Sequence, residues 1–160
     1  MKAKFTSRTS WREKLEKPQE PKVVDIPPKM SRFGKGTMLI PTPRLVDDLI
    51  RKVPKGKLVT VGELRRKLAA EFEADVTCPL TTGIFVRIAA EAAEEDRTNG
   101  RQRLTPYWRV IKDDGSLNPK FPGGPEQQTR HLRSEGFSFV RKGRKPPRVK
   151  HFEQSLYTLK

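Results

Sequence analysis

Apolar residues at helical spacing, followed by an alternating pattern, restrict this chain to a small α+β fold. The helical spacing, in steps of three and four, covers residues 45–53, 64–72 and 84–92. Residues 137–152 instead alternate in steps of two on either side of a Lys-Gly-Arg-Lys turn, which predicts a basic β-hairpin. We therefore predict a mostly helical α+β fold of the helix-turn-helix or winged-helix-like type, with the C-terminal β-hairpin as its wing.

Turn and cap residues mark the ends of these elements. Pro43 and Pro79 occupy positions where proline suits the first turn of a helix, and Thr60-Val-Gly-Glu63 matches a capping box. A shorter helix is predicted over residues 126–134, and buried extended chain over residues 107–111.

Basic residues concentrate at the two ends of the chain, whose formal net charge is +15. Residues 1–36 hold ten basic and four acidic residues, and residues 137–160 hold seven basic and one acidic, so each end carries +6. Basic segments that flank a nearly balanced domain are typical of polyanion-binding proteins, and we predict double-stranded DNA as the partner.

The first 36 residues differ in composition from the rest, with four prolines and few large apolar side chains. This composition predicts a basic, largely disordered arm over residues 1–36 and a folded domain over residues 37–160. Trp11 and Leu15 lie four positions apart and predict one short helical anchor within the arm.

Several classes of protein are disfavoured by composition. The sequence contains no run of eighteen apolar residues, so no membrane span is predicted, and no apolar signal core precedes the domain. We therefore expect a cytoplasmic monomer, associated with the nucleoid in a bacterial cell. The single cysteine, Cys78, excludes an internal disulfide. His131 and His151 lie far from it in sequence, so we predict no metal site and no cofactor.

Five short motifs recur here in the order and spacing of a known family. They are Val53–Leu64, Pro106-x-x-Arg109-Val110, Asp114-Gly115, Gly123-Gly124 and Leu132–Gly136. Across residues 41–139 the chain resembles the DNA-binding domain of the O6-alkylguanine-DNA alkyltransferases. The resemblance implies a fold that docks in the minor groove of DNA and rotates a damaged guanine into a pocket.

The residues that perform alkyl transfer in that family are absent here. Tyr107 stands in place of the acceptor cysteine and Trp108 in place of its histidine, and a phenol is a far weaker nucleophile than a thiolate. Alkyltransferase-like proteins, which carry tryptophan in place of the cysteine, bind alkylated DNA without repairing it. The resemblance therefore implies a non-enzymatic DNA-binding protein that recognises alkylated or otherwise damaged DNA, with Tyr107, Trp108 and Thr82 at the lesion pocket.

Two further positions with a role in the family have changed. The arginine that fills the gap left by the flipped base is matched by Thr81-Thr82-Gly83, and a tyrosine beside the target phosphate is matched by Val61. Arg109 is expected to be structural, tying its strand to nearby loops, and Glu135 to be a surface acid at a helix end with no histidine to orient. The predicted DNA contacts are Arg65, Arg66, Lys67, Thr81, Thr82, Arg87, Arg101, Arg103, Lys142, Arg144 and Lys145, and a repair protein is a second expected partner.

Two other hypotheses remain open at this point. Cys78 precedes Pro79 at a predicted helix start, where the helix dipole and a hydroxyl of Thr81 or Thr82 would favour a thiolate, and this suggests a thiol-dependent transferase. Alternatively, the acidic cluster Glu91, Glu94, Glu95 and Asp96 marks a protein-binding face of an interaction module that kept only the fold.

Overall fold

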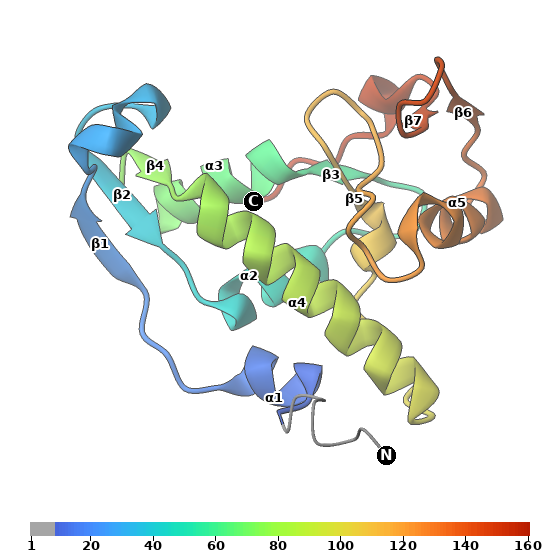
Figure 1. Ribbon diagram of the computed structural model, residues 1–160, viewed down its shortest axis with the longest axis horizontal. Coiled ribbons are helices and arrows are strands. Elements are labelled where there is room, and N and C mark those ends of the chain that lie inside the picture. The colour runs from blue at the N-terminus through green and yellow to red at the C-terminus, as the bar shows by residue number, and fades with distance from the viewer. Residues whose placement is uncertain (1–8) are drawn as a thin grey trace.

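Helices α2 (Pro43–Ile50), α3 (Val61–Glu71) and α4 (Pro79–Thr98) pack together at the centre of the protein, as the computed structural model of residues 9–160 shows (Figure 1). Their shared core includes Leu39, Val46, Ile50, Leu64 and Ala89, none of which has exposed surface. The predicted helices are thus confirmed. Within the described residues, no helix is long and apolar enough to cross a membrane.

Each of these helices begins at the residue that its sequence signal indicated. Pro43 and Pro79 lie in the first turns of α2 and α4. The Thr60 hydroxyl accepts a hydrogen bond from the Glu63 amide at 3.1 Å, which caps α3. The capping box is only half formed, because the Glu63 carboxylate accepts from Arg66 and from the Leu159 amide instead.

Three short sheets surround the helices. In the first, β2 (Thr37–Ile40) pairs antiparallel with β1 (Lys22–Asp25) and parallel with β4 (Val76–Thr77). In the second, β3 (Val59–Thr60) runs parallel to β5 (Val110–Ile111). The third is the predicted C-terminal hairpin, in which β6 (Phe139–Val140) pairs antiparallel with β7 (Arg148–Val149).

A second, smaller core holds the C-terminal part of the chain in place. It consists of Leu58, Ile111, Leu117, Leu132 and Val149. Leu132 belongs to α5 (Gly124–Ser134), so the hairpin and this helix form one packed unit beside the central helices.

The prediction of a largely disordered arm is wrong for the described part of residues 1–36, whereas the short helical anchor is confirmed. The segment forms α1 (Trp11–Glu16), β1 and the 3-10 turn η2 (Pro28–Phe33). Ser10 and Glu13 form a complete capping box at the start of α1. The part of the predicted arm over residues 1–8 lies outside the described residues.

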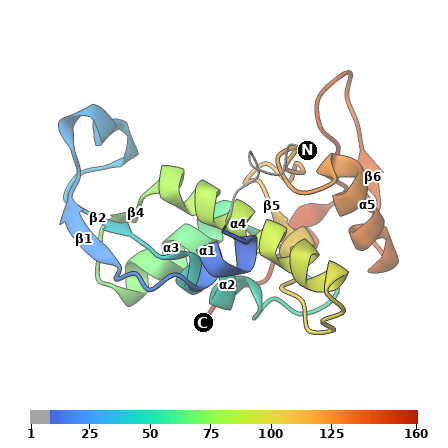
Figure 2. The same ribbon diagram turned by 60° about the horizontal axis from the view of Figure 1, so that its bottom comes forward.

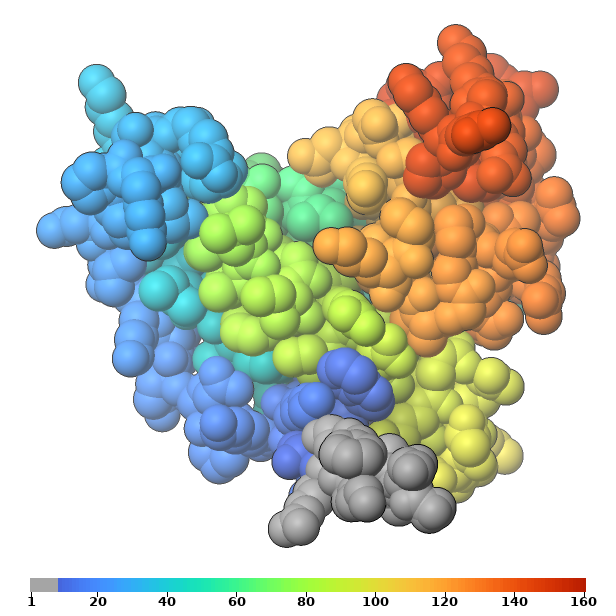
Figure 3. All heavy atoms as spheres, viewed as in Figure 1, coloured from blue at the N-terminus to red at the C-terminus, as the bar shows by residue number. Residues whose placement is uncertain are grey.

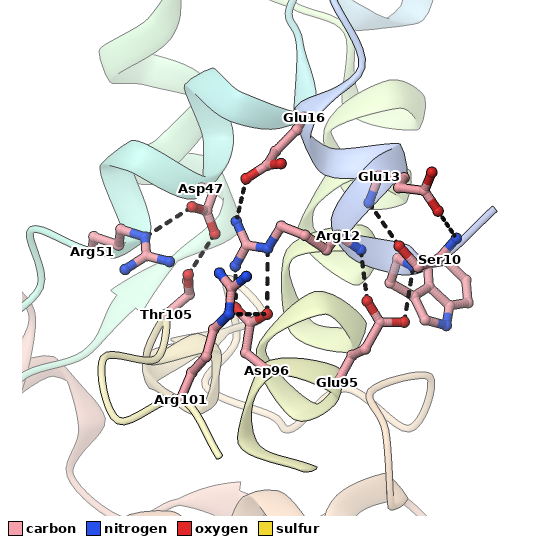
Figure 4. Close-up of polar contacts among 11 residues, drawn as sticks. Ser10, Arg12, Glu13, Glu16, Asp47, Arg51, Glu95, Asp96, Arg101 and Thr105 are labelled. Atoms are coloured by element: carbon pink, nitrogen blue, oxygen red, sulfur yellow. Dashed lines mark hydrogen bonds and ion pairs between the residues drawn. The ribbon is translucent and has the colours of Figure 1, made fainter. Parts of the chain in front are cut away.

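Helix α1 is held against the C-terminal half of α4, and Figure 4 shows the contacts. The amides of Trp11 and Arg12 donate to the Glu95 carboxylate at 3.1 and 2.9 Å, and the Arg12 guanidinium pairs with Asp96. Leu15 is buried, with 2% of its surface exposed. Composition missed this docking because the partners lie more than eighty residues away in sequence.

Two projections rise on the same side of α4 in both ribbon views, one at η2 and one at the C-terminal hairpin (Figures 1 and 2). The space-filling view shows a hollow between them (Figure 3). We call residues 26–37 the η2 arm and residues 139–150 the basic hairpin.

Candidate nucleic-acid interface

Tyr107 lies at the centre of the core, where it has no exposed surface. Residues 107–109 form a 3-10 turn, so the prediction of buried extended chain over residues 107–111 is wrong for these three residues and holds for Val110–Ile111. The Tyr107 hydroxyl donates to Glu94 at 2.7 Å. Burial, followed by this anionic partner, raises the pKa of Tyr107 far above its ordinary value. The phenol therefore stays neutral and is no nucleophile.

Glu135 is a buried junction, and the prediction of a surface acid with nothing to orient is wrong. Its side chain is 5% exposed and accepts hydrogen bonds from Trp108 Nε1 at 2.7 Å, from Arg109 at 2.9 to 3.1 Å and from the Gly56 amide at 3.0 Å. Burial alone would raise the pKa of Glu135, but the donors at Arg109, Gly56 and Trp108 together hold it below its ordinary value. The indole N–H of Trp108 is thus an uncharged hydrogen-bond donor to the Glu135 carboxylate.

Arg109 connects the two ends of this region, which agrees with its predicted structural role. Besides the ion pair with Glu135, its Nη1 donates to the Val53 carbonyl at 2.7 Å. The guanidinium therefore ties the 3-10 turn to the end of α5 and to the segment after α2.

His131 is the residue of this cluster that sequence analysis missed. Its ring stacks on Trp108 with centroids 4.1 Å apart and planes 11° apart, and its Nε2 lies 3.6 Å from the Glu94 carboxylate. Burial lowers the pKa of His131, and this effect outweighs the opposing attraction of Glu94. The signal that would have found it is its position four residues before Glu135, on the same face of α5.

Cys78 has the environment of a structural thiol. It precedes α4 and is 5% exposed, and the hydroxyls of Thr81 and Thr82 donate to its backbone carbonyl at 3.5 and 2.7 Å. The hydroxyls were predicted to face the sulfur, so this part of the thiol-transferase hypothesis is wrong. Among residues 9–160, no three His, Cys, Asp or Glu side chains are arranged to hold a metal ion.

The acidic cluster at the end of α4 is occupied by partners within the chain. Glu94 accepts from Tyr107, Glu95 caps α1, and Asp96 pairs with Arg12 and lies 3.8 Å from Arg101. Glu91, the fourth acid of the cluster, lies 3.6 Å from Arg87. All four acids that were predicted to mark a protein-binding face thus have partners within the chain.

The predicted DNA contacts divide into engaged and unengaged side chains. Arg66, Lys67 and Arg87 each pair with a glutamate three or four residues away, at 2.8, 3.9 and 3.6 Å. Arg65 donates to the Thr77 carbonyl and Arg101 pairs with Asp96. The unengaged residues, which are exposed and have no acidic partner in the described chain, are Arg103, Lys142, Arg144 and Lys145.

The basic hairpin is a segment in which basic residues follow one another closely. Residues 141–150 contain six basic residues and no acid. A groove of about 680 Å³ separates the hairpin from α5, and four arginines line it: Arg130, Arg133, Arg141 and Arg144. Sequence analysis identified the turn of the hairpin but missed the arginines on α5.

The first half of α4 presents an open face between the two projections. Leu80 and Ile84 lie one turn apart and are each 58% exposed, and Gly83 beside them is exposed as well. The first turn of α4 carries no acidic residue. This face therefore offers apolar side chains and a helix N-terminus to a partner without repelling an anion.

Two solved structures share this architecture. S. pombe Atl1, in a complex with damaged DNA containing O6-carboxymethylguanine, matches with a TM-score of 0.50 and 17% sequence identity over 72% of this chain and 94% of that one. S. pombe ATL, in a complex with DNA, matches with a TM-score of 0.54 and 18% identity over the same shares. The chain has the alkyltransferase-like fold. No family model and no curated protein matches the sequence.

The alkyltransferase-like fold does not assemble the predicted lesion pocket from Tyr107, Trp108 and Thr82. Tyr107 and Thr82 are completely buried, and their hydroxyls bond to Glu94 and to the Cys78 carbonyl. Trp108 is partly exposed, but its ring is stacked on His131. In this conformation Tyr107 and Thr82 belong to the core, whereas the start of α4 and the basic hairpin have exposed side chains.

Proposed function

We propose that this protein binds double-stranded DNA and recognises damaged DNA without repairing it. The observation that carries the proposal is the fold shared with two structures bound to DNA, one of which contains O6-carboxymethylguanine. The buried, neutral Tyr107 supports the non-enzymatic part, because a protonated phenol with no exposed surface cannot accept an alkyl group.

The proposed mode of binding uses two kinds of contact. Arginines and lysines of the basic hairpin neutralise phosphates and set the register of the protein on the duplex. The open face of α4 enters a groove, where Leu80 and Ile84 insert between base steps as apolar wedges do in minor-groove-binding proteins. A damaged and weakly stacked step is the easiest to open, which gives a preference for damage.

Fluorescence anisotropy with a labelled duplex tests the proposal. The wild-type protein is titrated onto a plain duplex and onto one with a single O6-carboxymethylguanine, each at two salt concentrations. We expect tighter binding to the damaged duplex and a steep loss of affinity with salt. Absence of binding at low salt would refute DNA binding, whereas equal affinities would remove only damage recognition.

The wedge is tested with a variant that leaves the charge unchanged. Leu80→Ala/Ile84→Ala should weaken binding by about tenfold or more, which is about 1.4 kcal/mol. Leu156→Ala is the matched control, because Leu156 is also an exposed leucine, at 40%, outside this face. Equal affinities of the two variants would contradict the wedge.

The absence of repair has its own assay and a consequence for partners. After incubation with the O6-alkylated duplex, the intact mass of the protein should be unchanged, and a gain of one alkyl group would refute the non-enzymatic role. Because a lesion that is bound and not repaired persists, the proposal includes a repair protein as a second partner, recruited by a monomer on DNA.

A further inference from the structure

The η2 arm, residues 26–37, is basic and carries no acidic residue. Lys29, Arg32 and Lys35 are exposed and have no acidic partner among residues 9–160. We propose that this arm is a second DNA-contacting element, which holds the duplex against the open face of α4 from the side opposite the basic hairpin. This inference rests on the proposed function and names a contact surface that the sequence resemblance does not cover.

The arm is held in place by contacts at its base. Strands β1 and β2 pair up to Asp25 and Thr37, and the Ile26 amide donates to the Gly36 carbonyl at 2.9 Å. The Asp75 carboxylate accepts from the Thr37 amide at 2.8 Å, and the Asp75 amide donates to the Thr37 hydroxyl at 3.2 Å. An arm fixed in this way loses little conformational entropy when it binds.

Charge distinguishes the arm from an ordinary solvated surface. On α3 and α4 the exposed Arg66 and Arg87 and the half-buried Lys67 each pair with a glutamate about one turn away, a pattern typical of helices that face water. The guanidinium of Arg32 instead lies over the Phe33 ring, 4.4 Å from its centroid, and remains free to pair with an anion.

The position of the η2 arm suits a DNA duplex better than a partner that contacts only one of the two projections. It rises on the same side of α4 as the basic hairpin, with the hollow of Figure 3 between them (Figures 1 to 3). Both projections are free of acids between residues 26 and 37 and between residues 141 and 150. A duplex carries phosphates on both of its flanks, so two separate basic projections can engage it at the same time.

The test compares two variants with the same loss of charge. Lys29→Gln/Arg32→Gln/Lys35→Gln removes the charge of the arm. The control, Lys17→Gln/Arg44→Gln/Lys52→Gln, removes two lysines and one arginine that are exposed and lack an acidic partner in the described chain. Lys17 follows α1, Arg44 lies in the first turn of α2, and Lys52 comes two residues after the end of α2. Figure 2 shows both helices on the side of α4 away from the projections.

The measurement is the slope of log affinity against log salt for an undamaged duplex. Each lost phosphate contact lowers the slope by about 0.9, so the arm variant should lose up to about 2.7 and the control less than about 0.5. Absence of wild-type binding would overturn the proposed function itself. Wild-type binding with equal slopes for the two variants would overturn the arm alone.

A tethered cleavage reagent gives a second, independent test. It is attached at Ser31→Cys, an exposed uncharged position of the arm, in a Cys78→Ala background. We expect localised cutting of a duplex with one lesion, and much weaker cutting from a reagent at Asp48→Cys on α2. Equal cutting from the two positions would contradict the placement of the arm on DNA.

Discussion

Replacement of Glu135, the residue that follows the last turn of α5, by alanine should strongly destabilise the protein. The substitution removes the acceptor for Trp108 Nε1 and for the Gly56 amide, and it leaves the Arg109 guanidinium, 14% exposed, without its carboxylate. Breaking a buried ion pair by removing one partner costs about 3 to 5 kcal/mol. For a chain of this size that is a fall in Tm of roughly 6–20 °C.

Glu71→Ala is the matched control for this experiment. Glu71 ends α3, a helix as long as α5, but its side chain is 42% exposed and lies 3.9 Å from Lys67. An exposed pair of this kind contributes less than about 1 kcal/mol. Urea denaturation followed by circular dichroism measures both variants, with the m-value checked for constancy. If Glu135→Ala costs no more than Glu71→Ala, the buried junction is refuted.

The same carboxylate predicts a pH dependence. Because the pKa of Glu135 is lower in the folded than in the unfolded chain, its contribution is complete above the unfolded value and is lost as pH falls through the folded value. The stability difference between wild type and Glu135→Gln should therefore be constant above about pH 5 and shrink in more acidic solution. A difference that does not change down to pH 3 would contradict this assignment.

Three further outcomes follow from burial. Leu15→Ala should cost about 2 to 4 kcal/mol, measured by the same denaturation, and a loss under about 0.5 kcal/mol would show that α1 is not docked. Tyr107→Phe removes the donor to Glu94 and should cost about 1 to 2 kcal/mol while DNA affinity stays within twofold, since no DNA contact is made by a buried ring. Iodoacetamide should modify Cys78 at least about a hundredfold more slowly in the folded than in the urea-unfolded protein. Equal rates would show that Cys78 is an accessible, reactive thiol.

The sequence predicted the parts of the fold that depend on neighbouring residues. The capping threonine Thr60 and the first-turn prolines Pro43 and Pro79 start their helices through contacts within one turn. The hairpin turn was predicted for the same reason, because alternation and turn residues act locally.

The parts that could not be predicted depend on long-range contacts. Residues 9–36 are held in place by contacts with Glu95, Asp96 and Asp75. The local composition of residues 9–36 does not show that these acids lie beside them in the folded chain. Glu135 was assigned to the surface because its expected histidine partner was absent, whereas in the folded protein Trp108 donates an N–H to its carboxylate.

The pairing of β1 with β2 has a consequence for where this protein can be shortened. Composition suggests Thr37 as the start of the folded domain, yet β2 begins at Thr37 and pairs with β1 on one side and β4 on the other. In a chain that begins at Thr37, β2 would become an edge strand. The backbone groups of β2 that now pair with β1 would then be unpaired, beside Met38 and Leu39. Exposed edges of this composition recruit further strands, so the trimmed protein should self-associate where the longer one stays in solution.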